Sequence, residues 1–217
     1  MTMAAPERTP LTVAAITSAA IELIDRDGLD GLSMRRLGTT LGYEAMALYK
    51  HVADKSALLD AVVEEVYAEM QPPDPAEPWQ ERIRSSAREL RRVAQRHPHL
   101  FVRLVTEPPS TTAVVERIDS ILSALQESGG DDAEVVHRFF LFVNMTSGVL
   151  LAETTALIAD GGTAVFDTER IDAEARCRAL LHFGERLATC DFDAEFDRTI
   201  EAYLSLVDRD QPGSDPG

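Results

Sequence analysis

The sequence predicts an all-α protein with two domains, and three observations support this fold class. Apolar residues recur at steps of three and four along nearly the whole chain, which is the period of a helix with one buried face. Strict alternation of apolar and polar residues, typical of half-buried strands, forms no convincing run. Four prolines fall within residues 71–78, so no helix can continue through this segment and we place the domain boundary there.

The helices of the smaller, N-terminal domain have recognisable ends. Thr12, Ser33 and Asp54 each precede a periodic apolar run, and each can cap a helix with a side-chain oxygen. Gly28 and Gly42 stand where the first and second helices must end, at positions that favour a positive φ. The domain is therefore expected to be a compact three-helix unit followed by a longer fourth helix.

The larger domain is expected to be helical throughout, with prolines and glycine pairs between its helices. The expected helices are residues 79–95, 99–106, 111–128, 132–159, 172–188 and 193–207. The expected domains are a flexible N-terminal arm at 1–10, the smaller domain at 11–70, the larger domain at 71–210 and a disordered tail at 211–217.

The charge of the chain is strongly acidic, with a formal net charge of −16 over 217 residues. Nonspecific attraction to nucleic acid or to an anionic membrane is therefore disfavoured, and any such binding must be local. Residues 33–55 are the exception, because four Lys and Arg face two acids there and a polyanion could dock. The longest apolar-rich run, residues 139–152, falls short of the ~20 residues of a membrane span. We expect a soluble, cytoplasmic protein.

A helix-turn-helix motif occupies residues 32–52. Gly38 lets the backbones of its two helices approach each other, and Gly42 permits the sharp turn between them. The second helix, expected at 44–51, begins with small residues, so it can press against base edges in a DNA major groove about 12 Å wide. The apolar residues spaced to pack the two helices together are Leu37, Leu41, Leu48 and Val52.

The side chains left outward on this motif are candidates for contacts with double-stranded DNA. Tyr49, Lys50 and His51 can reach backbone phosphates. Lys55 lies in the first turn of the next helix, where the helix dipole also favours an anion. With the small residues of the second helix and two residues of the first, the DNA-binding candidates are Ser33, Arg35, Ala45, Met46, Ala47, Tyr49, Lys50, His51 and Lys55.

This motif resembles the DNA-binding domain of the TetR family of bacterial repressors. The resemblance covers about residues 11–66 and rests on Leu41-Gly42-Tyr43 and on Leu48-Tyr49-Lys50-His51-Val52 followed by Lys55. It implies an all-α homodimer whose larger domain binds a small effector and alters the spacing of two DNA-reading heads. We therefore expect a repressor that binds a pseudo-palindromic operator as a homodimer and is released by a small molecule.

The larger domain is similar to the tetracycline-repressor subgroup, through features such as Trp79, the His97-Pro98 pair and residues 147–153. Arg103 or Leu104 stands where that subgroup has a metal-ligating histidine, which disfavours a magnesium–tetracycline chelate as ligand. The long helix expected at 132–159 is apolar on more than one face, so pocket and dimer interface both remain open for its residues. The effector-binding candidates are Phe101, Arg103, Phe140, Asn144, Ser147 and Glu153.

Other functional classes find less support in the sequence. No nucleophile elbow, P-loop or dinucleotide fingerprint is present, so we expect no enzymatic activity and no cofactor. His97 and His99 have no companion Cys or third His nearby in sequence, and the two cysteines lack zinc-site spacing, so no metal is expected. The alternative function is an effector-sequestering or protein-interaction module whose helix-turn-helix no longer reads DNA.

Overall fold

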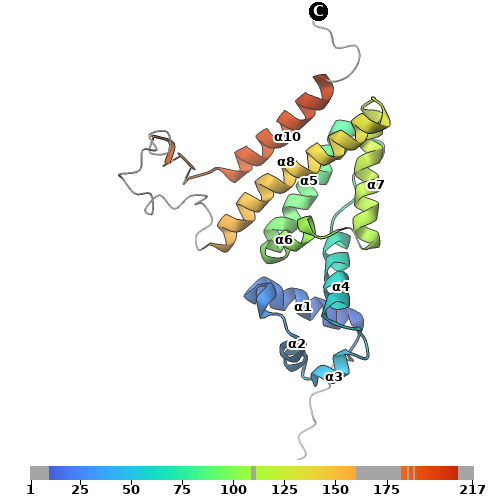
Figure 1. Ribbon diagram of the computed structural model, residues 1–217, viewed down its shortest axis with the longest axis vertical. Helices are drawn as coiled ribbons and strands as arrows, with labels where there is room; N and C mark the ends of the chain where they lie inside the picture. The colour runs from blue at the N-terminus through green and yellow to red at the C-terminus, as the bar shows by residue number, and fades with distance from the viewer. Residues whose placement is uncertain (1–9, 109–110, 160–181, 185, 188, 210–217) are drawn as a thin grey trace, which may run out of the picture. The chain divides into compact units, whose positions relative to one another are not determined.

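The structure is a computed structural model that describes residues 10–108, 111–159, 182–184, 186–187 and 189–209. Within these ranges the regular elements are helices and no strand occurs, which confirms the all-α prediction (Figure 1). The chain divides into two compact units: Met1–Glu69 with Pro108–Val114, and Met70–Glu107 with Val115–Gly217. The backbone N–H of Ala113 donates to a carboxylate oxygen of Glu64 at 3.0 Å, one contact that joins the 108–114 segment to the first unit.

The helices of the first unit begin at the predicted caps. The side-chain oxygen of Thr12 accepts from the N–H of Ala15, and that of Asp54 accepts from the N–H of Ala57. Gly28 ends the first helix with a φ of 72°. The elements of this unit are α1 (Val13–Asp27), the short 3-10 turn η1 (Leu29–Gly31), α2 (Met34–Leu41), α3 (Ala45–Leu48) and α4 (Lys55–Ala68).

Helix α3 is shorter than the sequence predicted. The segment expected to be helical over 44–51 is an α-helix only from Ala45 to Leu48. Beyond it the chain continues as tighter turns, because the N–H of Lys50 bonds to the carbonyl of Ala47 and that of His51 to Leu48, each three residues back.

The core of the first unit is formed by α1, α2, α3 and the start of α4. Its fully buried side chains come from the faces that the apolar period marked: Ile16, Ala20, Ile24, Leu37, Leu48 and Leu58. Leu41, expected to pack between the two helices of the motif, is only half-buried. The packing of α2 and α3 therefore rests on Leu37, Leu48 and Val52.

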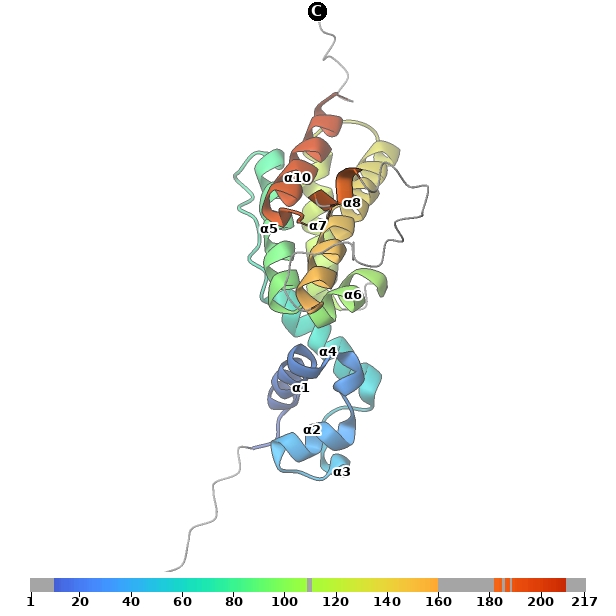
Figure 2. The same ribbon diagram turned by 90° about the vertical axis from the view of Figure 1, so that its left-hand side faces the viewer.

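The second unit is a bundle around one long helix. Its elements are α5 (Trp79–Arg96), α6 (Pro98–Thr106), α7 (Thr112–Glu127, whose first residues belong to the first unit), α8 (Asp132–Ile158) and α10 (Phe192–Arg209). Helix α8 packs against α5, α6 and α10, and α10 lies along it in both views (Figures 1 and 2). Most of the helix expected at 172–188, the arm at 1–9 and the tail at 211–217 lie outside the described residues.

Helix α8 is 27 residues long, and an 18-residue window of it has a mean hydropathy of 1.5. By length and composition alone it could cross a membrane, although the shorter run noted in the sequence could not. The central helix of a helical bundle meets the same criteria. Helix α8 carries a buried Arg138 and a buried Glu153, and other segments of the unit form hydrogen bonds with both side chains.

Candidate nucleic-acid interface and candidate effector site

The turn between α2 and α3 is built on two glycines. A Cβ atom at Gly38 would lie 2.8 Å from the carbonyl oxygen of Tyr43 and 3.2 Å from the amide nitrogen of Ala45, so only glycine fits this approach. Gly42 ends α2 in the left-handed conformation with a φ of 75°. Both predicted glycine roles are confirmed, and together they fix α3 against α2.

The basic side chains of the motif divide into paired and unpaired groups. Arg36 is held inside the unit, because one of its Nη atoms lies 2.6 Å from the carboxylate of Asp27 and the other donates to the carbonyl of Gly31. The side chains of Arg35 and Lys50 make no hydrogen bond or ion pair with any residue that the structure describes. Arg35 and Lys50 are exposed, so they are the cations available to an external anion.

Lys55 differs from the sequence-based picture of a free ammonium at a helix start. Its Nζ donates to the backbone carbonyl of Leu32 at 2.8 Å, which links the first turn of α4 to the residue before the α2 cap. Ser33 is also occupied, because its Oγ accepts from the N–H of Arg36 as the N-cap of α2. An ammonium has three N–H donors, so Lys55 retains two for other partners.

The remaining DNA-binding candidates lie on α3 and the turn after it. The side chain of Met46 is 73% exposed and that of Tyr49 is 43% exposed, while Ala45 and Ala47 are half-buried and His51 is exposed. One exposed side chain on this surface was missed as a candidate. Glu44 precedes α3 and makes no capping hydrogen bond, and its acidic type gave no sign of a role beside nucleic acid.

The six effector-binding candidates do not converge on one site. Phe101 of α6 is fully buried and Glu153 of α8 is 5% exposed, so both face the interior of the second unit. Phe140 is 58% exposed and Asn144 is exposed, while Ser147 is half-buried. At 100° per residue, Phe140 and Glu153 point about 140° apart around the helix axis. The candidates on α8 therefore occupy two different faces.

Arg103 and Glu153 already have partners. Arg103 forms an ion pair with Glu107, one turn along, at 2.9 Å. The carboxylate of Glu153 accepts from the Nε and Nη2 atoms of Arg91 at 2.9 and 2.8 Å and from the side-chain amide of Gln95 at 2.8 Å. These bonds meet the requirement that a buried carboxylate be paired. The bond to Glu153 raises the pKa of Arg91 above its usual value.

The arginines of α5 pair with acidic side chains. One pair lies within the helix, between Arg84 and Glu81, but several bonds reach other helices: Arg84 to Glu201, and Arg91 to Glu153 and Asp193. Arg91 and Gln95 had no distinguishing sequence signal, because their shared partner Glu153 is about sixty residues away in the sequence.

Two family models match this chain. One, described as "Bacterial regulatory proteins, tetR family", matches residues 16–62. The other, described as "Tetracyclin repressor-like, C-terminal domain", matches residues 71–205. The first match contains α2, α3 and their glycine turn, and the second contains α5, α6, α7, α8 and α10 up to residue 205.

Individual proteins give the same result. An HTH-type transcriptional regulator of Saccharopolyspora erythraea is 33% identical over 196 residues, which cover 89% of this chain and 83% of the relative. The tetracycline repressor protein class D of Escherichia coli is 32% identical over 212 residues, which cover 91% and 94%. The crystal structure of Streptomyces coelicolor ActR in complex with actinorhodin is 25% identical, with a TM-score of 0.74 over 92% of this chain and 97% of ActR.

Proposed function

Because this chain belongs to the TetR family of bacterial transcriptional regulators, we propose that it is a homodimeric repressor that binds a pseudo-palindromic operator and leaves it when a small effector binds. As a member of this family it is a DNA-binding transcriptional regulator. The operator, the dimer and the release step belong to the proposal. Its site of action is the cytoplasm, where bacterial DNA lies.

The observation that carries the proposal is that Arg35 on α2 and Lys50 just after α3 are exposed cations without a partner among the described residues, beside a turn that glycine holds in a fixed geometry. In a chain of net charge −16, exposed cations beside α3, the helix expected to enter the DNA major groove and called the recognition helix below, favour local contact with a polyanion. Met46, with Ala45 and Ala47, would contact base edges. The proposed contacts to phosphates and sugars are those of Ser33, Arg35, Tyr49, Lys50, His51 and Lys55.

The homodimer is supported by the outward face of α8. Phe140 is 58% exposed and Val136 is 49% exposed, one turn apart on the same face. A Cβ atom at Gly148 would meet nothing within 4 Å, so the backbone there is open to close approach by another helix. We infer that a second copy covers this face. Two copies would then present two recognition helices to two half-sites.

We propose that the effector site lies in the second unit. Phe101, Arg103 and Glu153 are its proposed inward lining, while Phe140, Asn144 and Ser147 would reach an effector only from the dimer face. Relatives named as tetracycline repressors support a polycyclic ligand class, as does the actinorhodin complex of ActR. Arg103 disfavours a metal chelate, because its guanidinium has no acceptor atom that could ligate a divalent cation.

Selection of double-stranded DNA from a random pool tests the proposal. The purified protein at moderate ionic strength should enrich an inverted repeat with equal half-sites, because a symmetric dimer reads symmetric DNA. Repeating the selection after denaturing and refolding removes any copurified effector. If no sequence is enriched in either round, the repressor proposal fails and the effector-sequestering module replaces it.

A further inference from the structure

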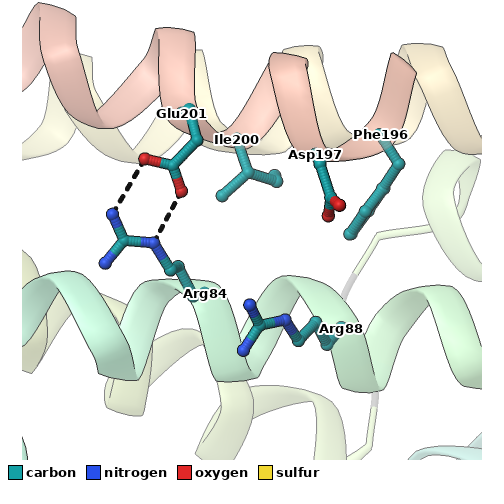
Figure 3. Close-up of a pocket in the computed structure, with 6 residues that line it drawn as sticks. All are labelled: Arg84, Arg88, Phe196, Asp197, Ile200 and Glu201. Carbon is teal, nitrogen blue, oxygen red and sulfur yellow. Dashed lines mark hydrogen bonds and ion pairs between the residues drawn. The ribbon is translucent and has the colours of Figure 1, made fainter. Parts of the chain in front are cut away.

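A groove of about 300 Å³ lies between α5 and α10 of the second unit, and none of the proposed effector residues is among its lining, although Arg91 and Gln95 bind Glu153. Its lining consists of Arg88, Arg91, Arg92 and Gln95 from α5 with Phe196 and Asp197 from α10. A smaller neighbouring hollow shares Arg88, Phe196 and Asp197 and continues toward Arg84 and Glu201 (Figure 3). The volume of the groove, about 300 Å³, is at the lower end of the range for small-molecule sites.

The two helices face each other through two successive pairs of opposite charge. Arg84 and Arg88 are one turn apart on α5, and Glu201 and Asp197 are one turn apart on α10. The first pair is closed: the Nε and Nη2 atoms of Arg84 donate to the two carboxylate oxygens of Glu201 at 2.7 and 2.9 Å. This fork also lowers the pKa of Glu201.

The second pair is open. Figure 3 shows Arg88 opposite Asp197 with no interaction drawn between them. The structure gives neither side chain a hydrogen bond or an ion pair with any residue that it describes. The side chain of aspartate is one methylene shorter than that of glutamate. The carboxylate of Asp197 therefore does not reach the guanidinium of Arg88 in the way that Glu201 reaches Arg84. An acceptor and a donor site are left facing each other across the groove.

The arginines that line the groove beside Arg88 already have partners within the chain. Arg91 is bound to Glu153 and Asp193, and its guanidinium lies 4.8 Å from the ring centroid of Phe196. Arg92 is bound to Glu89 at 2.9 Å. Phe196 also lines the groove, but at 2% exposure little of its ring is accessible there. The free hydrogen-bonding capacity of the groove is thus concentrated at Arg88 and Asp197.

We propose that this open pair binds a small carboxylate that also carries a hydroxyl or ammonium donor, such as a 2-hydroxy acid or a 2-amino acid. The carboxylate accepts two parallel hydrogen bonds from Arg88, as Glu201 does from Arg84. The hydroxyl or ammonium group donates to Asp197, which would repel a ligand that is only an anion. The proposal does not depend on DNA binding.

Saturation-transfer NMR with glycolate as the probe tests the site in the full-length protein. We expect a saturable signal with the wild type and weaker signals with acetate, which lacks the donor, and with ethylene glycol, which lacks the carboxylate. The Arg88→Gln variant should bind glycolate about tenfold more weakly, because the charge-assisted fork is lost. Arg198→Gln is the matched control, since it removes the same charge from an exposed position of α10 outside the groove.

Asp197→Glu provides the decisive variant. The added methylene should let residue 197 reach Arg88 and close the second pair as Glu201 closes the first. We expect this variant to lose glycolate binding while its melting temperature stays at or above that of the wild type, so a folding defect cannot produce the result. Equal glycolate signals from the wild type, Arg88→Gln and Asp197→Glu, or no saturable signal from the wild type, would overturn the proposal.

Discussion

Two adjacent arginines of α2 have different roles in the structure. Arg36 binds Asp27 and the carbonyl of Gly31, and so joins α2 to the end of α1. Arg35 is exposed and makes no side-chain hydrogen bond or ion pair with any residue that the structure describes. The sequence predicted the caps Thr12, Ser33 and Asp54 because capping is local. The pairing of Arg36 depends on a turn of chain that brings Asp27 back to it.

Replacing Arg35 or Lys50 by Ala should weaken binding to all DNA sequences by a similar factor. Each change removes one phosphate contact, so the slope of log affinity against log salt should fall by about one. Thermal stability should not change, because neither side chain has a partner in the part of the chain that the structure describes. Fluorescence anisotropy at several salt concentrations measures the DNA affinity and the salt slope.

The matched variant Arg36→Ala should instead lower the melting temperature. An unchanged salt slope for Lys50→Ala would exclude a phosphate contact by Lys50.

Gly38→Ala should destabilise the first unit, because its Cβ would press on the backbone carbonyl of Tyr43 at 2.8 Å. Overpacking of this kind costs about 1–3 kcal/mol, and backbone atoms have little room to relax. Urea denaturation gives the free energy of unfolding, and DNA affinity should fall as α3 moves. Thr40→Ala is the control, since Thr40 is exposed on the same helix. A stable Gly38→Ala variant with normal DNA binding would contradict this account of the turn.

At the scale of elements, the long polar side chains of α5 connect it to other helices of the second unit. Arg91 alone reaches Glu153 on α8 and Asp193 on α10. The sequence can indicate that Glu153 needs partners, because it is a carboxylate on an apolar helix. It did not show which partners, because arginines on an exposed helix face and arginines that bridge helices have the same periodicity.

Glu153→Ala should lower the free energy of unfolding by about 2 kcal/mol, because it leaves Arg91 half-paired and Gln95 without its acceptor. Glu153→Gln keeps one acceptor oxygen and should cost less. Chemical denaturation of both variants and of the exposed control Thr155→Ala gives the comparison. If Glu153 contacts the effector as well, Glu153→Gln will weaken the effector response more than it weakens the fold. Equal stabilities of all three variants would remove Glu153 from the packing of the unit.

At the scale of the whole molecule, α8 shows why a sequence leaves interfaces undecided. Both of its faces are apolar, so the helical period could not separate the core of one chain from a contact with a second chain. Burial separates them: Phe142 is 3% exposed while Phe140 is 58% exposed, two residues apart. The resemblance in the DNA-binding motif supplied the expectation of a dimer, and the exposed face supplies residues with which to test it.

Phe140→Asp should convert the protein to monomers, because a charge on a covered apolar face would be buried without a partner. The fold of each chain should survive, since Phe140 is exposed within its own chain. Sedimentation velocity should then report half the mass of the wild type. Affinity for a full inverted repeat should fall at least about a hundredfold, while affinity for a single half-site should not change, because only the linkage of the two heads is lost. Phe140→Leu keeps the face apolar and should remain dimeric. A dimeric Phe140→Asp variant would place the subunit contact on another face of the second unit.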